Sequence, residues 1–94
     1  MPYEPRYSKE ALQQLRKLRA FDRAAILDQI EEVLCVNPTK ESKAKVKLLR
    51  QPAPTRYRLR VGDFRVFFDV EEEIVSIVQV LSKEDAVAYL EEMS

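Results

Sequence analysis

The chain has 94 residues, enough for one domain with a modest hydrophobic core. Its 46% hydrophobic and 34% charged residues are typical of a globular protein and exclude a disordered one. There is no histidine, and Cys35 is the only cysteine, so a histidine base, an internal disulfide and a cysteine-cluster metal site are excluded. We expect a cytoplasmic protein, because no apolar run is long enough to span a membrane and the N-terminus lacks the apolar core of a secretion signal.

The formal net charge is zero, but the charge is unevenly distributed. The segment from Thr39 to Arg65 holds nine lysines and arginines against Glu41 and Asp63, a local net charge of +7 that the rest of the chain balances. A neutral total therefore does not exclude nucleic-acid binding.

The N-terminal part predicts a short strand followed by two helices. Tyr3–Tyr7 is expected as a strand at a sheet edge, because Pro5 lacks an amide hydrogen. Ser8 is the expected N-cap of a helix over Lys9–Arg19, whose leucines recur at helical spacing.

The second helix is expected from about Arg23 to Val36, with Asp22 as its N-cap and Asn37–Pro38 as its stop. The short link between the helices predicts an antiparallel helical hairpin. Cys35 lies near the end of this helix and is interpreted as a small buried apolar residue.

A lysine-rich connection, Thr39–Lys47, comes next. Lys43, Lys45 and Lys47 alternate and would share one face if the segment were extended, although a soluble loop is the simpler interpretation. Val46–Arg50 is a candidate short strand, and the prolines within Gln51–Thr55 predict a rigid turn.

The segment Tyr57–Val70, YRLRVGDFRVFFDV, contains the only glycine and predicts a β-hairpin with a two-residue turn at Gly62–Asp63. This register fixes the cross-strand pairs, which are Val61–Phe64, Arg60–Arg65, Leu59–Val66, Arg58–Phe67, Tyr57–Phe68 and Arg56–Asp69.

Alternation sorts the hairpin into two faces. An apolar core face carries Tyr57, Leu59, Val61, Phe64, Val66 and Phe68. The other face carries Arg56, Arg58, Arg60, Arg65 and Phe67. Arg60 opposite Arg65 is an unfavourable pair, so either these arginines are solvated, with Asp69 relieving part of the repulsion, or an anion such as a phosphate binds between them.

Ile74–Leu81, IVSIVQVL, is almost continuously apolar and is expected at or near the sheet centre. Ser82 is the expected cap of a last helix that ends near Met93. The sequence thus predicts a single α+β domain, 1–94, with an N-terminal helical hairpin on one face of a small antiparallel meander sheet and a C-terminal helix. We expect all helices on that face and the arginines on the other.

A basic sheet face with Phe67 and Tyr89 nearby suits an RNA strand, because cations bind phosphates and rings stack on bases. RNA cleavage then needs a base for the 2′-hydroxyl, cations for the transition state and an acid for the leaving oxygen.

The helical hairpin, the segment YRLRVGDFRVFFDV, the strand IVSIVQVL and the helix SKEDAVAYL resemble the RelE/ParE family of bacterial toxins. The resemblance covers nearly the whole chain and is most specific over Arg60–Val66. It implies a toxin domain inhibited by an antitoxin encoded beside it. RelE-type members are ribosome-dependent mRNA endonucleases, whereas ParE-type members share the fold and poison DNA gyrase.

The resemblance also implies site residues. The catalytic set carried over from RelE-type enzymes is Arg58, Arg60, Arg65, Lys83 and Tyr89. The expected RNA contacts are Lys43, Lys45, Lys47, Arg56 and Phe67. The best-known enzymes have lysines at the places of Arg58 and Arg60, and arginine is a poor base, so either Lys47 or Lys83 acts as the base or the arginines only hold phosphate. Leu81 and Ser82 replace the Gly-His or Gly-Arg pair of many relatives.

The expected function is that of a type II toxin that cleaves mRNA at the ribosome without a metal or other cofactor. Its expected partners are the cognate antitoxin, the ribosome and mRNA, with DNA reached only through the antitoxin and no membrane. The alternatives are a gyrase inhibitor without nuclease activity and an inactive relative that still binds an antitoxin.

Overall fold

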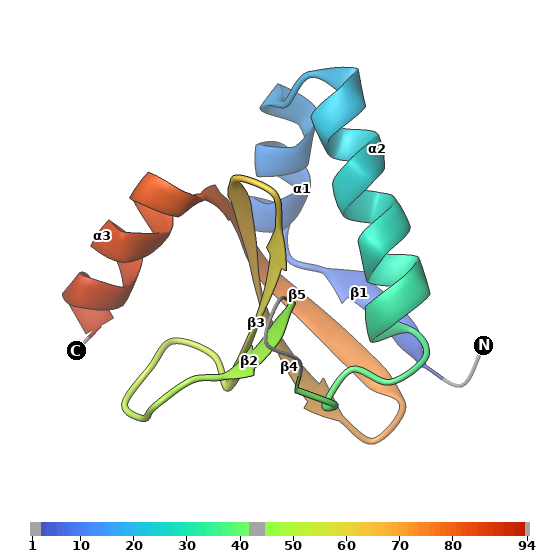
Figure 1. Cartoon of the computed structure of the whole chain (residues 1–94), viewed down its shortest axis with the longest axis vertical. Coiled ribbons are helices and arrows are strands. Elements are labelled where there is room, and N and C mark those ends of the chain that lie inside the picture. Colours follow the sequence, from blue (N-terminus) through green and yellow to red (C-terminus); the bar gives the residue numbers. More distant parts are fainter. Residues whose placement is uncertain (1–2, 42–44, 94) are drawn as a thin grey trace.

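A five-stranded sheet lies between the N-terminal helices and the C-terminal helix in the computed structural model, which describes residues 3–41 and 45–93 (Figure 1). The helices are α1 (Lys9–Lys17), α2 (Ala20–Gln29), a π-helical turn η1 (Ile30–Leu34) that continues α2, and α3 (Lys83–Met93). The strands are β1 (Glu4–Tyr7), β2 (Val46–Leu48), β3 (Tyr57–Val61), β4 (Phe64–Glu71) and β5 (Ile74–Ser82).

The strand order is β1-β5-β4-β3-β2, so β5 is an interior strand, as predicted. Strands β2 to β5 form the expected antiparallel meander. The sheet as a whole is mixed, however, because β1 runs parallel to β5. The prediction of a wholly antiparallel sheet was wrong because β1 pairs with the last strand of the chain, and no turn between neighbouring strands dictates its direction.

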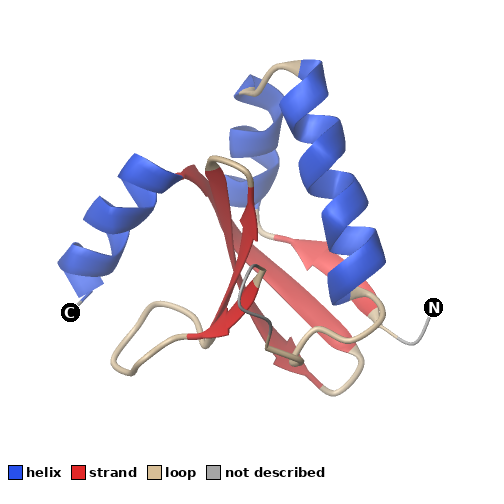
Figure 2. Cartoon of the chain, viewed as in Figure 1, coloured by secondary structure: helices blue, strands red, loops and turns tan. Residues whose placement is uncertain are grey.

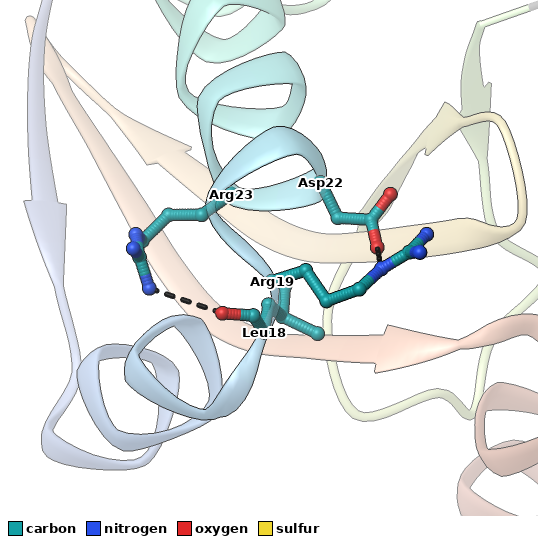
Figure 3. A network of polar contacts seen from close by, with 4 residues as sticks. All are labelled: Leu18, Arg19, Asp22 and Arg23. Atoms are coloured by element: carbon teal, nitrogen blue, oxygen red, sulfur yellow. Dashed lines mark hydrogen bonds and ion pairs between the residues drawn. The ribbon is translucent and has the colours of Figure 1, made fainter.

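The link between α1 and α2 is held by two arginines (Figure 3). Ser8 caps α1 as predicted, since its Oγ accepts the Ala11 N–H at 3.0 Å. Asp22 is not the N-cap of α2, because that helix already begins at Ala20. The Asp22 carboxylate instead accepts a bond from Arg19 Nε at 3.2 Å. The Arg23 guanidinium donates to the carbonyls of Leu15 and Leu18 at 3.3 and 3.1 Å, and so satisfies the end of α1.

The helical hairpin also closes the edge of β5 beyond the end of β1. Ser8 Oγ donates to the Val78 carbonyl at 2.7 Å, and Gln14 Oε1 accepts the Val80 N–H at 2.6 Å. These side chains replace bonds that a neighbouring strand would make. Cys35 is buried at the end of η1, as predicted, and burial raises the pKa of its thiol.

The hydrophobic core fills the space between the sheet and the helical hairpin. Its largest members from the sheet are Leu59, Phe68 and Ile77, and they meet Ile26 and Ile30 of the hairpin. Helix α3 lies on the opposite side of the sheet (Figure 2), so the expectation that all helices share one face was wrong. No helix in the described residues is long and apolar enough to cross a membrane.

Candidate functional site

The β3–β4 hairpin has the predicted register. Five of the predicted pairs are present, including Arg60 opposite Arg65, and Gly62 at the turn has φ of +56°. A positive φ strains any residue with a Cβ, so glycine at this position sets the turn and, with it, the face on which each arginine lies.

A groove of about 460 Å³ lies between this face and α3. The sheet contributes Arg58, Arg65 and Phe67 to its walls. Helix α3 contributes Lys83, Glu84, Ala86, Val87 and Leu90. The groove thus combines three cations with an apolar helix surface.

Arg58 is the least satisfied of these cations. Its Nε is buried and, among the described residues, has no hydrogen-bond partner. Burial lowers the pKa of this guanidinium, and the nearby positive charges of Arg65 and Arg60 lower it further. A buried N–H donor without a partner costs free energy, and a bound anion would remove that cost.

Arg65 is held in place by the turn that precedes it. One terminal nitrogen of its guanidinium donates to the carbonyls of Gly62 and Phe64, both at 2.9 Å. These bonds restrict the rotamers of a long side chain and fix its charge at the mouth of the groove.

Lys83 links the start of α3 to the same turn. Its backbone N–H donates to the Asp63 carbonyl at 2.8 Å, and its ammonium lies 3.7 Å from the Asp63 carboxylate. Both side chains are more than half exposed, so the ion pair contributes little to stability, about 0–1 kcal/mol. The Lys83 charge is therefore available at the groove.

Phe67 packs against α3. Its ring has no exposed surface and meets Tyr89 edge-to-face, with ring centroids 5.1 Å apart. A fully buried ring cannot stack on a base in this arrangement, so contact between Phe67 and RNA stays a prediction that requires α3 to move. Tyr89 is half-buried and lies outside the groove, with its pKa raised by burial and then by the charge of Asp69.

The remaining predicted residues lie around the groove or away from it. Lys47 is exposed and pairs in register with Arg58. Arg60 is exposed on the same face, whereas Arg56 borders another hollow beside Asp69. The Lys45 ammonium donates to Gln29 at the end of α2, away from the groove, and Lys43 falls outside the described residues.

The structure therefore brings together Arg58, Arg65 and Lys83 of the predicted catalytic set, and Phe67 of the predicted RNA contacts. It adds Glu84, which the sequence reasoning missed. The available signal was its position, one residue after the predicted Lys83 at the start of the last helix.

The fold matches several solved toxin structures. The archaeal RelE in the RelE–RelB complex of Pyrococcus horikoshii OT3 is 23% identical, with a TM-score of 0.72 over 88% of this chain and 97% of that one. A chain of the RelBE2 toxin–antitoxin complex of Mycobacterium tuberculosis is 25% identical, with a TM-score of 0.66 over 87% and 99%. A mutant of the Escherichia coli toxin RelE in the free state is 23% identical, with a TM-score of 0.71 over 98% and 97%.

No curated protein sequence matched the chain. The profile of a family described as the ParE toxin of the type II toxin–antitoxin system parDE matches residues 6–87, most of the sequence. The fold and this match agree with the resemblance inferred from the hairpin and the last helix. The chain belongs to the ParE toxin family of type II toxin–antitoxin systems, within the RelE/ParE superfamily.

Proposed function

We propose that this protein is the toxin of a type II toxin–antitoxin system and that it cleaves mRNA at the ribosome. The observation that carries the proposal is the groove in which Arg58, Arg65 and Lys83 meet. Three cations along one groove, one of them with a buried and unpartnered Nε, suit a phosphodiester.

The chemistry follows from these positions. A base takes the proton of a ribose 2′-hydroxyl, and the 2′-oxygen attacks the adjacent phosphorus while the bond from phosphorus to the 5′-oxygen breaks, leaving a 2′,3′-cyclic phosphate and a 5′-hydroxyl. Arg58 and Arg65 stabilise the charge that develops on the phosphoryl oxygens. The ammonium of Lys83 gives a proton to the leaving 5′-oxygen.

The proposed partners are the cognate antitoxin, the ribosome and mRNA. The solved structures of RelE–RelB from P. horikoshii and Methanococcus jannaschii, and RelBE2 from M. tuberculosis, are toxin–antitoxin complexes, which supports an antitoxin partner for this chain. On the ribosome, the exposed Lys47, Arg56 and Arg60 extend the basic face beyond the groove and would contact RNA phosphates, and Tyr89 would orient a base if α3 shifts.

A second candidate function is inhibition of DNA gyrase without nuclease activity. The match to the ParE toxin profile favours it, as do arginines at positions where a nuclease would use lysines. Expression in cells separates the two functions. Primer extension on cellular mRNA gives codon-periodic cuts for a nuclease, whereas DNA-damage signalling with intact mRNA indicates a gyrase poison.

Arg65→Ala tests the proposed site. The variant should fold normally but lose growth arrest, because removing one transition-state donor typically slows a reaction by about 10²–10³-fold. Arg16→Ala, which removes an exposed arginine from the last turn of α1, should retain full toxicity. Full toxicity of Arg65→Ala would refute the site, and absence of growth arrest by the wild-type chain would indicate an inactive relative.

A further inference from the structure

Four charged side chains line the groove, and they comprise three cations that can donate protons and one carboxylate that can accept a proton. Arginine keeps its proton at any pH that proteins tolerate, which removes Arg58 and Arg65 as bases. The Lys83 ammonium lies 3.7 Å from the Asp63 carboxylate, and an ammonium can donate protons but not accept them. Glu84 is the one carboxylate among the described residues that line the groove.

The backbone of Glu84 is fixed at both sides. Ser82 Oγ accepts the Asp85 N–H at 3.1 Å and caps α3, while the Lys83 N–H is bound to the hairpin turn. Glu84 is the second residue of α3, and Val87, three positions later, lines the same groove. The start of α3 therefore holds the backbone of Glu84 at a fixed position in the groove wall.

The side chain of Glu84 is also available. It is exposed and, within residues 3–41 and 45–93, has neither a hydrogen bond nor an ion pair. Arg58, on the opposite wall, also lacks a partner at its Nε. Two groups of opposite charge thus line one groove without pairing, which leaves room for a ligand that satisfies both.

Resting on the proposed function, we propose that Glu84 is the general base for RNA cleavage. The Glu84 carboxylate takes the proton of the 2′-hydroxyl as the 2′-oxygen bonds to phosphorus. The bond to the 5′-oxygen breaks, and that oxygen takes a proton from Lys83. One proton enters Glu84 and one leaves Lys83, so exchange with water restores both groups.

This assignment replaces the two lysines considered from the sequence. Lys47 does not line the groove, and Lys83 serves as the acid at the leaving oxygen. It also explains how a groove with arginines instead of lysines can cleave RNA, because the arginines then need only bind the phosphate.

The test compares single-turnover cleavage of mRNA on programmed ribosomes by the wild type, Glu84→Gln and Asp85→Asn. Glutamine keeps the size of Glu84 and removes its ability to accept a proton, so we expect cleavage about 10²–10⁴-fold slower. Asp85 lies in the same helical turn but outside the groove, so Asp85→Asn should retain the wild-type rate. Glu84→Gln should bind programmed ribosomes at least as tightly as the wild type, because it removes a negative charge that would lie beside the phosphate.

The pH profile distinguishes a base from a residue that only positions others. The wild-type rate should rise with pH at acidic pH and then level off, as one carboxylate loses its proton in the field of Arg58, Arg65, Lys83 and Asp63. Glu84→Gln should lack this rise, and Glu84→Asp should keep it at a reduced rate.

Each failure has its own signature. If the wild type leaves mRNA intact, the proposed function fails and this inference fails with it. If the wild type cleaves and Glu84→Gln cleaves as fast as Asp85→Asn, only the role of Glu84 is overturned. A slow Glu84→Gln variant that keeps the acidic rise would also overturn it, since Glu84 would then be structural. Circular dichroism of each variant verifies folding.

Discussion

Phe67 and Phe68 are neighbours in β4, neither has exposed surface, and they lie on opposite faces of the sheet. Phe68 belongs to the main core and stacks on Tyr57 with ring centroids 5.5 Å apart. Phe67 is covered only from the side of α3, beside arginines. The same alternation of side chains therefore builds one apolar face that stabilises the fold and another face whose positive charges reduce its stability.

The largest expected effect is on the free energy of unfolding, compared between the variants Phe68→Ala and Phe67→Ala. Phe68→Ala should lower the free energy of unfolding by about 3–5 kcal/mol, because it leaves a cavity in the main core. That is a large fraction of the roughly 5–14 kcal/mol expected for a chain of this length. Denaturant unfolding of both variants measures the difference, and Phe67→Ala should cost less, because α3 can settle into the space.

Hydrogen exchange sharpens the same comparison. Phe67→Ala should speed exchange in α3 and leave α1 and α2 protected, since the ring supports only the C-terminal helix. Equal losses of stability for the two alanine variants would show that α3 and the helical hairpin belong to one cooperative core.

Arg58→Met tests whether the basic face costs stability. Methionine fills a similar volume without a buried, unpartnered polar atom, so the variant should be more stable by about 1 kcal/mol. It should also bind mRNA-programmed ribosomes more weakly. Lys47→Met changes an exposed neighbour of Arg58 on β2 and should shift stability by less than about 0.5 kcal/mol.

The opposite result would be informative. If Arg58→Met is destabilised while Lys47→Met is not, the Arg58 side chain supports α3 through its packing, and the groove is structural.

Local chemistry explains how much of this fold was predictable. A lone glycine in a two-residue turn fixes the register of β3 and β4, and a side-chain oxygen at Ser8 or Ser82 marks a helix start. The parallel pairing of β1 and the position of α3 depend on contacts between distant segments. The residues of β5 that face either side of the sheet are mostly apolar, so the sequence does not indicate which side α3 covers. It also does not indicate the register shift opposite Phe67 and Phe68.

The site was predictable to the same extent. Register alone gathered the arginines on one face, but it could not show which of them the last helix covers. Arg58 and Arg65 lie under α3, whereas Arg60, one alternation away, is exposed. The burial of Phe67 follows from Tyr89, twenty-two residues later in the chain, and no local pattern encodes such a contact.

The smallest expected effect concerns Tyr7 and Tyr89, which lie on opposite sides of the sheet. Burial raises the pKa of Tyr89 above 10.0, as it does for Tyr7 on the side of the helical hairpin. Near and above pH 10 the unfolded chain has released these protons while the folded chain keeps them, so the stability should fall as pH rises through this window. Tyr89→Phe should make this fall in stability shallower and leave the stability below pH 9 unchanged. Denaturant unfolding at a series of pH values measures the effect.

Tyr7→Phe removes the corresponding group from the other side of the sheet and serves as the matched comparison. If only Tyr7→Phe makes the fall shallower, the Tyr89 phenol is solvated in solution, and α3 spends much of its time away from Phe67.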